Sequence, residues 1–217
     1  MDYPPALRIA LLGISGSGKS ASGNTILNLN NRFRENNPPD APPPSCDTET
    51  AEVEGRNILV IDTPGLFETS VDEDKLIAEM KTCAQRSFPG LHAFLLVIRL
   101  DVRLRYEERN IMEWIEDFFG EYALRYTFIL FTHADALENR SLDEFIRGRT
   151  DLQVLVNSCG GDRYHAFNNR DRQNRDQVTE LIQKIERMVS NNGGHYNTPQ
   201  EFKKSENSKS YWKFNWK

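Results

Sequence analysis

Four short apolar runs occupy residues 7–12, 57–61, 93–98 and 127–131 of the chain. Val, Ile, Leu and Phe fill these runs almost continuously, as in strands that are covered on both faces. Tyr164–Phe167 is a weaker candidate for a fifth strand of this kind. Residues 50–54 are expected to pair antiparallel with the second run across Gly55-Arg56, as a hairpin at the edge of the sheet.

Patterns of helical period lie between and after the apolar runs. One helix is predicted where apolar residues fall at i, i+3, i+4, i+7 and i+8, namely at Ile111, Trp114, Ile115, Phe118 and Phe119. Gly120 supplies a stop, residues 178–189 repeat the spacing, and Ser141 with Glu144 forms a capping box for a further helix. This alternation predicts a three-layer α/β fold with a mostly parallel sheet of roughly six strands.

Two segments differ in composition from this core pattern. Residues 36–45 hold five prolines in ten residues, which predicts an extended loop. From Asn191 onward the chain turns polar, so we expect the domain to cover residues 1–190, with a C-terminal extension over 191–217. The end of that extension, residues 211–217, interleaves aromatics with lysines. It suits contact with a membrane surface or a partner, and a tail packed on the domain or a loose end is the alternative.

Composition narrows the class of protein. The 217 residues carry 27 Lys+Arg against 32 Asp+Glu, a formal net charge of −5, which argues against general nucleic-acid binding. The longest purely apolar run is far shorter than the ~20 residues that span a bilayer. The N-terminal sequence lacks the features of a signal peptide. Cys46, Cys83 and Cys159 are scattered and are interpreted as reduced thiols, so we expect a cytoplasmic protein.

The segment from Gly13 to Ser20 (GISGSGKS) matches the phosphate-binding pattern G-x-x-x-x-G-K-[ST] between a predicted strand and a helix. Its glycines let backbone N–H groups surround phosphates, Lys19 would reach the β- and γ-phosphates, and the Ser20 hydroxyl would bind Mg²⁺. A flexible glycine-rich turn is the alternative interpretation. The nucleotide-binding residues predicted here are Gly13, Ser15, Gly16, Ser17, Gly18, Lys19, Ser20 and Ala21.

The sequence Asp62-Thr63-Pro64-Gly65 ends the second apolar run. An acidic residue at the end of a strand beside a phosphate-binding loop is the expected second partner of Mg²⁺, through water. Gly65 would free the backbone to sense a γ-phosphate. An ordinary turn at the end of a strand is the alternative, and the distance of about 45 residues from Lys19 favours the nucleotide-binding interpretation.

The sequence Thr132-His133-Ala134-Asp135 follows the fourth apolar run. In GTPases an aspartate at this place accepts hydrogen bonds from guanine N1–H and the exocyclic amine, which adenine does not offer in that geometry. His133 stands where lysine is usual, and its ring would lie along the base. A helix N-cap is the alternative role for Asp135. Asn168 and Asn169, after the fifth strand, are the expected second contact with the base.

Several segments together resemble the GIMAP family of immunity-associated GTPases, which is related to the septin-like and Toc-like GTPases. They are GKSASGNTIL (18–27), DTPGLFET (62–69), HAFLLVIRLDVR (92–103) and FTHADAL (131–137). The resemblance implies a P-loop GTPase domain that binds GTP or GDP with Mg²⁺, with slow or absent intrinsic hydrolysis. It also implies dimerisation across the nucleotide face, with itself or a related GTPase, and scaffolding on intracellular membranes.

The sequence departs from that family in the first loop, where Pro43 falls at the position of the threonine that closes on Mg²⁺. Ser45, Thr48 and Thr50 are candidate replacements. Leu66 follows Gly65 where Ras-like enzymes have a water-orienting glutamine, a lack that the family shares. The family's R-F-T-E segment reads Arg103-Leu104-Arg105-Tyr106, which keeps the arginine and changes its surroundings.

Two functions of different class are compatible with these motifs. The first is a nucleotide-dependent dimerising switch or scaffold, and the second is an active GTPase stimulated across a homodimer by an arginine supplied in trans. Arg103 is the predicted catalytic residue in the second case. Arg103 is one of four arginines within eleven residues: Arg99, Arg103, Arg105 and Arg109. The alternative to a catalytic role is that these arginines form a solvated surface where a helix begins. An ATPase is disfavoured by Asp135.

Overall fold

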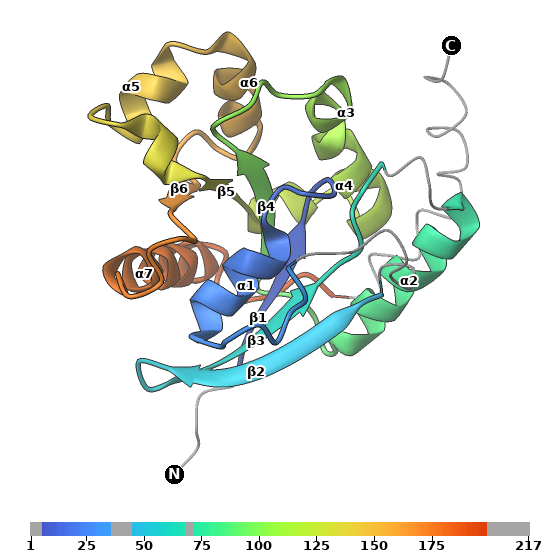
Figure 1. The fold of residues 1–217 in the computed structure, drawn as a ribbon. Coiled ribbons are helices and arrows are strands. Elements are labelled where there is room, and N and C mark those ends of the chain that lie inside the picture. Colours follow the sequence, from blue (N-terminus) through green and yellow to red (C-terminus); the bar gives the residue numbers. More distant parts are fainter. Residues whose placement is uncertain (1–5, 36–44, 68–71, 199–217) are drawn as a thin grey trace.

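The computed structural model describes residues 6–35, 45–67 and 72–198, and a six-stranded sheet runs through its centre (Figure 1). The spatial order of the strands is β2-β3-β1-β4-β5-β6. Only the edge pair β2–β3 is antiparallel, and each remaining neighbouring pair is parallel. The strands are β1 (Leu7–Leu12), β2 (Asp47–Val53), β3 (Arg56–Asp62), β4 (Ala93–Arg99), β5 (Thr127–Thr132) and β6 (Tyr164–Phe167).

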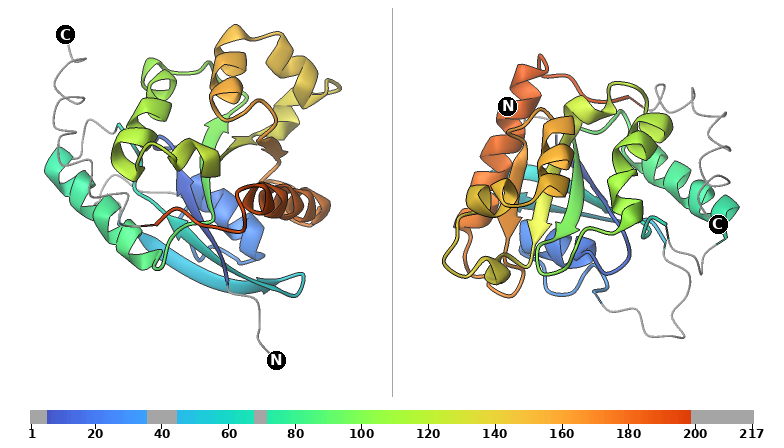
Figure 2. Two further views of the ribbon diagram at one scale, coloured as in Figure 1. Left: turned by 180° about the vertical axis from the view of Figure 1, so that it is seen from behind. Right: turned by 90° about the horizontal axis from the view of Figure 1, so that it is seen from above.

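Helices cover both faces of this sheet, which confirms the predicted three-layer α/β fold (Figures 1 and 2). One face is covered by α1 (Lys19–Leu27) and α7 (Asp176–Asn191), and the other by α2 (Glu73–Arg86), α4 (Ile111–Phe119) and α6 (Thr150–Ser158). Shorter turns complete the order: α3 (Tyr106–Arg109), α5 (Leu142–Arg147) and the 3-10 helices η1 (Ala123–Tyr126) and η2 (Ala134–Leu137).

Successive side chains of the central strands point to opposite faces of the sheet, so the core has two parts, one on each face. Leu7, Ile9 and Leu11 of β1 pack with α1 and α7, whereas Ala10 and Leu12 pack with α2 and α4. Because both faces are buried, the strands carry apolar residues at nearly every position. This is why the apolar runs matched the strands to within one residue at each end.

Local signals at the helix ends also act as predicted. Gly120 forms the C-cap of α4, and Ser141 and Glu144 make both hydrogen bonds of the capping box at the start of α5. The predicted hairpin is present, and its turn is formed by Glu54 and Gly55, both of which have positive φ.

Ordered structure continues past the boundary expected at residue 190. Helix α7 ends at Asn191, and a short antiparallel bridge then pairs Asn197 with Leu91 beside β4. Asn197 is fully buried, and its amide group donates to the Phe119 carbonyl at 3.5 Å. Residues 191–198 are therefore part of the folded domain.

The expectation of three reduced cysteines is wrong for two of them. Cys46 and Cys83 form a disulfide between the residue before β2 and helix α2, with Cα atoms 5.5 Å apart. The Cys46 backbone is also held by α2, because its N–H donates to Glu79 and its carbonyl accepts from Arg86. The separation of 37 residues hides this contact in the sequence. Cys159 is a free thiol, and burial raises its pKa to about 12.

None of the helices in the described ranges is long and apolar enough to cross a bilayer. The aromatic and lysine residues at 211–217, and most of the proline-rich loop, lie outside the described residues.

Candidate functional site

The glycine-rich loop joins β1 to α1 at the carboxyl edge of the sheet. Gly13, Gly16 and Gly18 all have positive φ, between 76° and 147°. A Cβ atom on Gly13 would lie 2.6 Å from the Val97 carbonyl oxygen and 2.9 Å from the Ser17 hydroxyl. Glycine is therefore required there by both backbone conformation and space. Ser15 and Gly16 are exposed at the outer rim of the loop, and Ser17 is fully buried.

Neighbouring strand ends hold this loop in place. The Leu66 N–H donates to the Gly13 carbonyl at 2.9 Å, and the Thr132 hydroxyl donates to the Ser17 carbonyl at 2.7 Å. Gly65 packs so closely that a Cβ atom on it would lie 2.9 Å from the Ser15 nitrogen. The motifs that follow β1, β3 and β5 are thus brought together at one edge, as expected for a parallel sheet.

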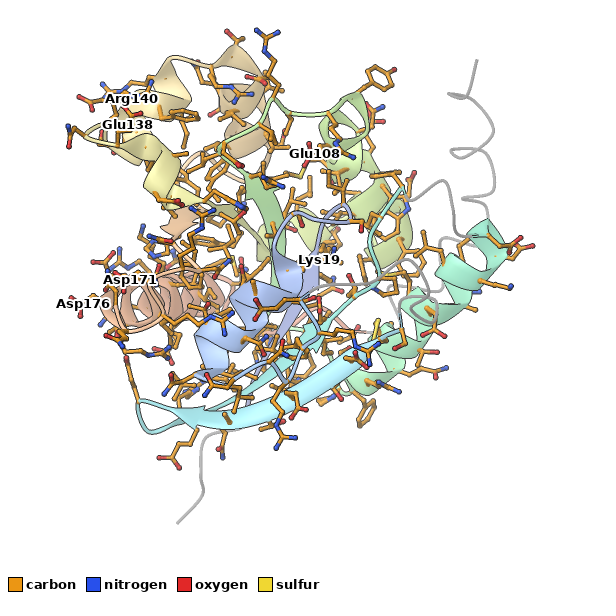
Figure 3. All side chains as sticks on the ribbon, viewed as in Figure 1. Lys19, Glu108, Glu138, Arg140, Asp171 and Asp176 are labelled. Carbon is orange, nitrogen blue, oxygen red and sulfur yellow. A yellow bond between two sulfur atoms is a disulfide. The ribbon has the colours of Figure 1, made fainter. Side chains whose placement is uncertain are left out.

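Lys19 and Ser20 begin helix α1, and Figure 3 shows Lys19 at the centre of the molecule beside the loop. The Lys19 ammonium lies over the loop and donates to the carbonyls of Gly13 at 3.1 Å and Ile14 at 2.9 Å. Ala21 follows in the first turn, where its carbonyl accepts from the Thr25 hydroxyl. The predicted phosphate-binding residues therefore form one continuous stretch that comprises the loop and the first turn of α1.

The Ser20 hydroxyl donates to Oδ2 of Asp62 at 2.5 Å. The other oxygen, Oδ1, is buried and has no hydrogen-bond partner among the described residues. Burial raises the pKa of Asp62, and Lys19 and the Ser20 hydrogen bond oppose that shift. An ion near both groups would satisfy the orphaned oxygen and favour the ionised carboxylate.

These donors fit Mg²⁺, which prefers oxygen ligands and is usually held by few protein groups together with phosphates and water. No cluster of three or more His, Cys, Asp or Glu side chains suited to a metal occurs within the described ranges. Ser20 and Asp62 are thus the residues that would hold the ion, which would neutralise phosphate charge when bound.

The base side of the site is built by the turn after β5. His133 has a left-handed backbone conformation, and its Nδ1 lies 3.1 Å from the Thr132 hydroxyl. Asp135 is the second residue of η2 and is exposed, and its Oδ2 accepts from the guanidinium of Arg170 at 2.9 Å. Arg170 itself is 79% exposed, so this partner can move aside without breaking core contacts.

The two asparagines after β6 occupy different environments. The Asn169 amide donates to the Ser22 hydroxyl at 3.0 Å, and its oxygen accepts from the Thr25 hydroxyl at 2.8 Å. Asn169 therefore holds α1 in place. The Asn168 oxygen accepts from the Arg170 backbone at 3.0 Å, next to the Asp135 ion pair.

Arg103 is exposed and makes none of these hydrogen bonds. With Leu104 it lines an open hollow of about 560 Å³, whose other side is formed by Gly148, Arg149, Thr150 and Asp151. Arg99 is the member of the arginine run that contacts the glycine loop, with Nη1 3.5 Å from the Gly16 carbonyl. Sequence reasoning did not separate the two, because the path of the chain after a strand is set by tertiary contacts.

The candidate replacements for the loop threonine do not reach the Ser20–Asp62 pair through any hydrogen bond in the described residues. Ser45 donates to Asp47 at 3.4 Å, while Thr48 and Thr50 lie within β2, opposite Ile61 and Leu59 of β3. Pro43 lies outside the described residues.

The same fold occurs in solved structures of GTPases. The chain superposes on Toc33 from Arabidopsis thaliana in complex with Mg²⁺ and GMPPNP with a TM-score of 0.64, at 20% identity, over 86% of this chain and 85% of that chain. A structure from work on dimerisation and GTPase activity of the chloroplast translocon components atToc33 and psToc159 gives a TM-score of 0.67, at 20% identity, over 86% and 84% of the two chains.

The sequence profile of the AIG1 family matches residues 7–215, and the chain belongs to this family. It is 36% identical over 193 residues to the human GTPase IMAP family member 8, and 32% identical over 203 residues to immune-associated nucleotide-binding protein 12 of Arabidopsis thaliana. These matches cover 88% and 90% of this chain, but only 29% and 51% of the two relatives. The resemblance to immunity-associated GTPases is thus confirmed.

Proposed function

We propose that this chain binds GTP and GDP with Mg²⁺ and acts as a nucleotide-dependent dimerising switch or scaffold with slow or absent intrinsic hydrolysis. The observation that carries the proposal is the Ser20–Asp62 pair beside the glycine loop, where Asp62 keeps one buried oxygen without a described partner. The complexes of Toc33 with Mg²⁺ and GMPPNP or GDP support the same assignment by analogy of fold.

Each predicted group has a defined task in this proposal. The backbone of the glycine loop and the N-terminus of α1 surround the phosphates, and Lys19 leaves the Gly13 and Ile14 carbonyls to pair with phosphate oxygens. Asp135 releases Arg170 and accepts the two guanine N–H groups. Asn168 is the second contact with the base in this proposal, because its side-chain oxygen accepts from the Arg170 backbone whereas Asn169 bonds to α1.

Slow hydrolysis follows from the position after Gly65. Leu66 is 1% exposed and packs in the core, so it offers no polar group to orient an attacking water. Within this site, binding and conformational signalling are therefore better supported than rapid turnover.

Calorimetric titration with GDP, GMPPNP and ADP, each with Mg²⁺, tests the nucleotide assignment. We expect GDP and GMPPNP to bind and ADP to bind far more weakly, because the Asp135 carboxylate only accepts hydrogen bonds and adenine lacks the two N–H donors that guanine offers there. Asp135→Asn should weaken GDP and strengthen xanthosine diphosphate, since its mixed donor and acceptor complements xanthine. Equal binding of ADP and GDP by the unmutated protein would contradict guanine specificity.

Sedimentation velocity with GDP and with GMPPNP tests the switch. We expect a larger species with the triphosphate analogue, and the same monomeric species with both nucleotides would contradict the dimerisation proposal. The relevant analogy is to the Toc33 neighbours, one of which is a dimerization deficient mutant. The proposal also includes a heterodimer with a related GTPase, which sedimentation of a mixture of the two proteins tests.

The alternative function is an active GTPase stimulated in trans by Arg103. The exposed position of Arg103 favours it, because a side chain outside its own site is available to a partner. Isologous contacts exchange identical residues, so each copy would supply its arginine to the other. Specific activity should then rise with protein concentration, and neither Arg103→Ala nor Arg103→Lys should show that rise. Flat and equal activity in all three proteins would contradict the alternative.

We also propose a cytoplasmic location with peripheral contact to intracellular membranes through residues 211–217, on the resemblance to immunity-associated GTPases and not on the cysteines, two of which are paired. Cosedimentation with anionic vesicles, compared with a chain ending at residue 198, tests this contact. Equal binding of both chains would contradict it.

A further inference from the structure

Arg99 lies where the phosphate and base sides of the site meet. Strand β4 runs between β1 and β5, and Arg99, its last residue, is paired in register with Thr132 of β5. The glycine loop follows β1 on one side, and the turn with His133 and Asp135 follows β5 on the other. A cation at this strand end is therefore placed between the groups assigned to phosphates and those assigned to guanine.

Asp101 fixes the direction of the Arg99 guanidinium. Nε donates to Oδ1 of Asp101 at 2.9 Å and Nη2 donates to Oδ2 at 2.7 Å, so the two groups form a planar fork. Nη1 then lies 3.5 Å from the carbonyl oxygen of Gly16 in the glycine loop. The fork raises the pKa of Arg99 and lowers the pKa of Asp101, which keeps both groups charged. The pair thus presents an oriented cation at the rim of the phosphate loop.

The same aspartate connects this cation to the base side. Oδ1 of Asp101 lies 3.8 Å from Nδ1 of His133, which is itself 3.1 Å from the Thr132 hydroxyl. That hydroxyl donates to the Ser17 carbonyl in the glycine loop. The 3.8 Å between Asp101 and His133 is longer than a hydrogen bond, so Asp101 lies beside the turn after β5 and hydrogen-bonds to Arg99 alone of these groups.

We propose that Arg99 contacts the phosphate groups of a guanine nucleotide bound in the same chain, and that Asp101 is its positioning residue. The proposal rests on the proposed function and adds a phosphate contact to it. An arginine has five N–H groups, and the contacts above use three of them. The two others can meet phosphate oxygens at the rim of the loop. Arg103, in contrast, faces the hollow near Arg149 and is the candidate for a partner's site.

Binding of GDP and GMPPNP to Arg99→Ala tests the contact. We expect roughly tenfold weaker binding of at least one nucleotide, with the melting temperature of the nucleotide-free protein unchanged, since Arg99 is a third exposed. Arg99→Lys should restore little, because lysine cannot form the fork with Asp101. Arg147→Ala, which removes an exposed arginine from α5, is the charge-matched control and should bind as the unmutated protein does.

A double-mutant cycle tests the role of Asp101. We expect Asp101→Ala to weaken binding severalfold, and the double variant Arg99→Ala/Asp101→Ala to bind no worse than Arg99→Ala alone. Full additivity of the two changes would overturn the positioning role. The dependence of affinity on KCl concentration should also become shallower in Arg99→Ala, because one ionic contact with phosphate is lost.

The outcomes separate this inference from the proposed function. If the unmutated protein binds no GDP or GMPPNP, the proposed function fails. If it binds both, and Arg99→Ala binds both within twofold of the Arg147→Ala control, the phosphate contact is overturned while the proposed function stands. A fall in melting temperature without a change in affinity would assign Arg99 to bracing the loop and would also overturn the contact.

Discussion

Arg8 lies near the amino ends of the parallel strands and Arg99 lies at their carboxyl ends. The two guanidinium groups differ in burial and in the number of their partners. Arg8, near the start of β1, is 7% exposed and directs its guanidinium to the carbonyls of Gly90 and Ala6 and to the His92 ring. The Tyr196 ring covers it, with the guanidinium carbon 5.0 Å from the ring centre. Arg99 has one carboxylate partner and a long contact with a loop.

The difference indicates that Arg8 stabilises the fold, whereas Arg99 is available to bind a ligand. At the amino ends of the strands, burial of Arg8 and His92 is offset by contacts from the same chain, including the returning segment at Tyr196 and Asn197, although Oδ1 of Asn197 is itself buried without a described partner. At the carboxyl edge, Asp62 keeps a buried oxygen without a described partner. A protein tolerates such an atom where a ligand or ion satisfies it. Variants at the two edges should accordingly affect different measurements.

Lys19→Ala should have the largest effect. It removes the ammonium that faces the loop carbonyls and would pair with phosphates, so affinity for GDP and GMPPNP should fall well over tenfold, more than ~1.4 kcal/mol. Calorimetry checks the affinity, with Lys81→Ala on the exposed side of α2 as control. Unchanged affinity would contradict the nucleotide site itself.

Arg8→Met should show the reverse behaviour. The methionine keeps much of the apolar volume but leaves the Gly90 carbonyl and the His92 ring without their partner. We expect a loss of about 2 kcal/mol in the free energy of unfolding, and GDP affinity within twofold of the unmutated protein. Urea denaturation and calorimetry on the same sample check both values. A matching loss of affinity would show that the two edges are coupled.

The pH dependence of stability should report on His92. Burial, with the nearby charges of Arg8 and Arg56, lowers the pKa of His92 to about 4. Its unfolded pKa is near 6.5, so between these values the unfolded state binds more protons and stability falls as pH falls. From pH 7 to pH 5 the His92 contribution should be about 1–2 kcal/mol. The His92→Asn variant should lose that share of the slope, and identical slopes would contradict the assignment.

The smallest effect is expected at the start of α5, where Ser141 makes a local capping contact and none of the contacts assigned to the nucleotide. Ser141→Ala removes the capping box of α5, whose serine accepts from the Glu144 backbone at 3.2 Å. The cost should be about 1 kcal/mol in the free energy of unfolding, without a change in GDP affinity. Ser141→Ala therefore gives the loss of stability expected from a change outside the nucleotide site. A weaker GDP affinity in this variant would show that any loss of stability lowers affinity.

Strands and capped helices could be predicted because their signals are local. Buried strands in a parallel sheet need apolar residues at nearly every position, and the α5 capping box lies within four residues of chain. Helix α2 was not predicted, since its core-facing residues are interspersed with many charges; they are Leu76, Ile77, Met80, Cys83 and Ala84.

Within the candidate site, sequence pattern identified the loops but not the directions of their side chains. The motifs placed Lys19, Asp62 and Asp135 at the edge where the structure has them. The orientation of Asn169 toward α1, and the contact of Arg99 rather than Arg103 with the glycine loop, depend on tertiary packing. The Cys46–Cys83 contact needs the same information, because it joins segments that only the folded sheet brings together.

The disulfide between Cys46 and Cys83 makes residues 46–83 a covalently closed loop. This loop includes β2, β3 and Asp62, whereas Lys19 and Ser20 lie outside it. Trypsin has three cleavage sites between the two cysteines, at Arg56, Lys75 and Lys81. A single cut at any of them opens the loop but leaves the two pieces joined through sulfur, so they should migrate as one until a reductant is added. The carboxylate expected to serve Mg²⁺ is thereby fastened to the rest of the protein along two covalent routes.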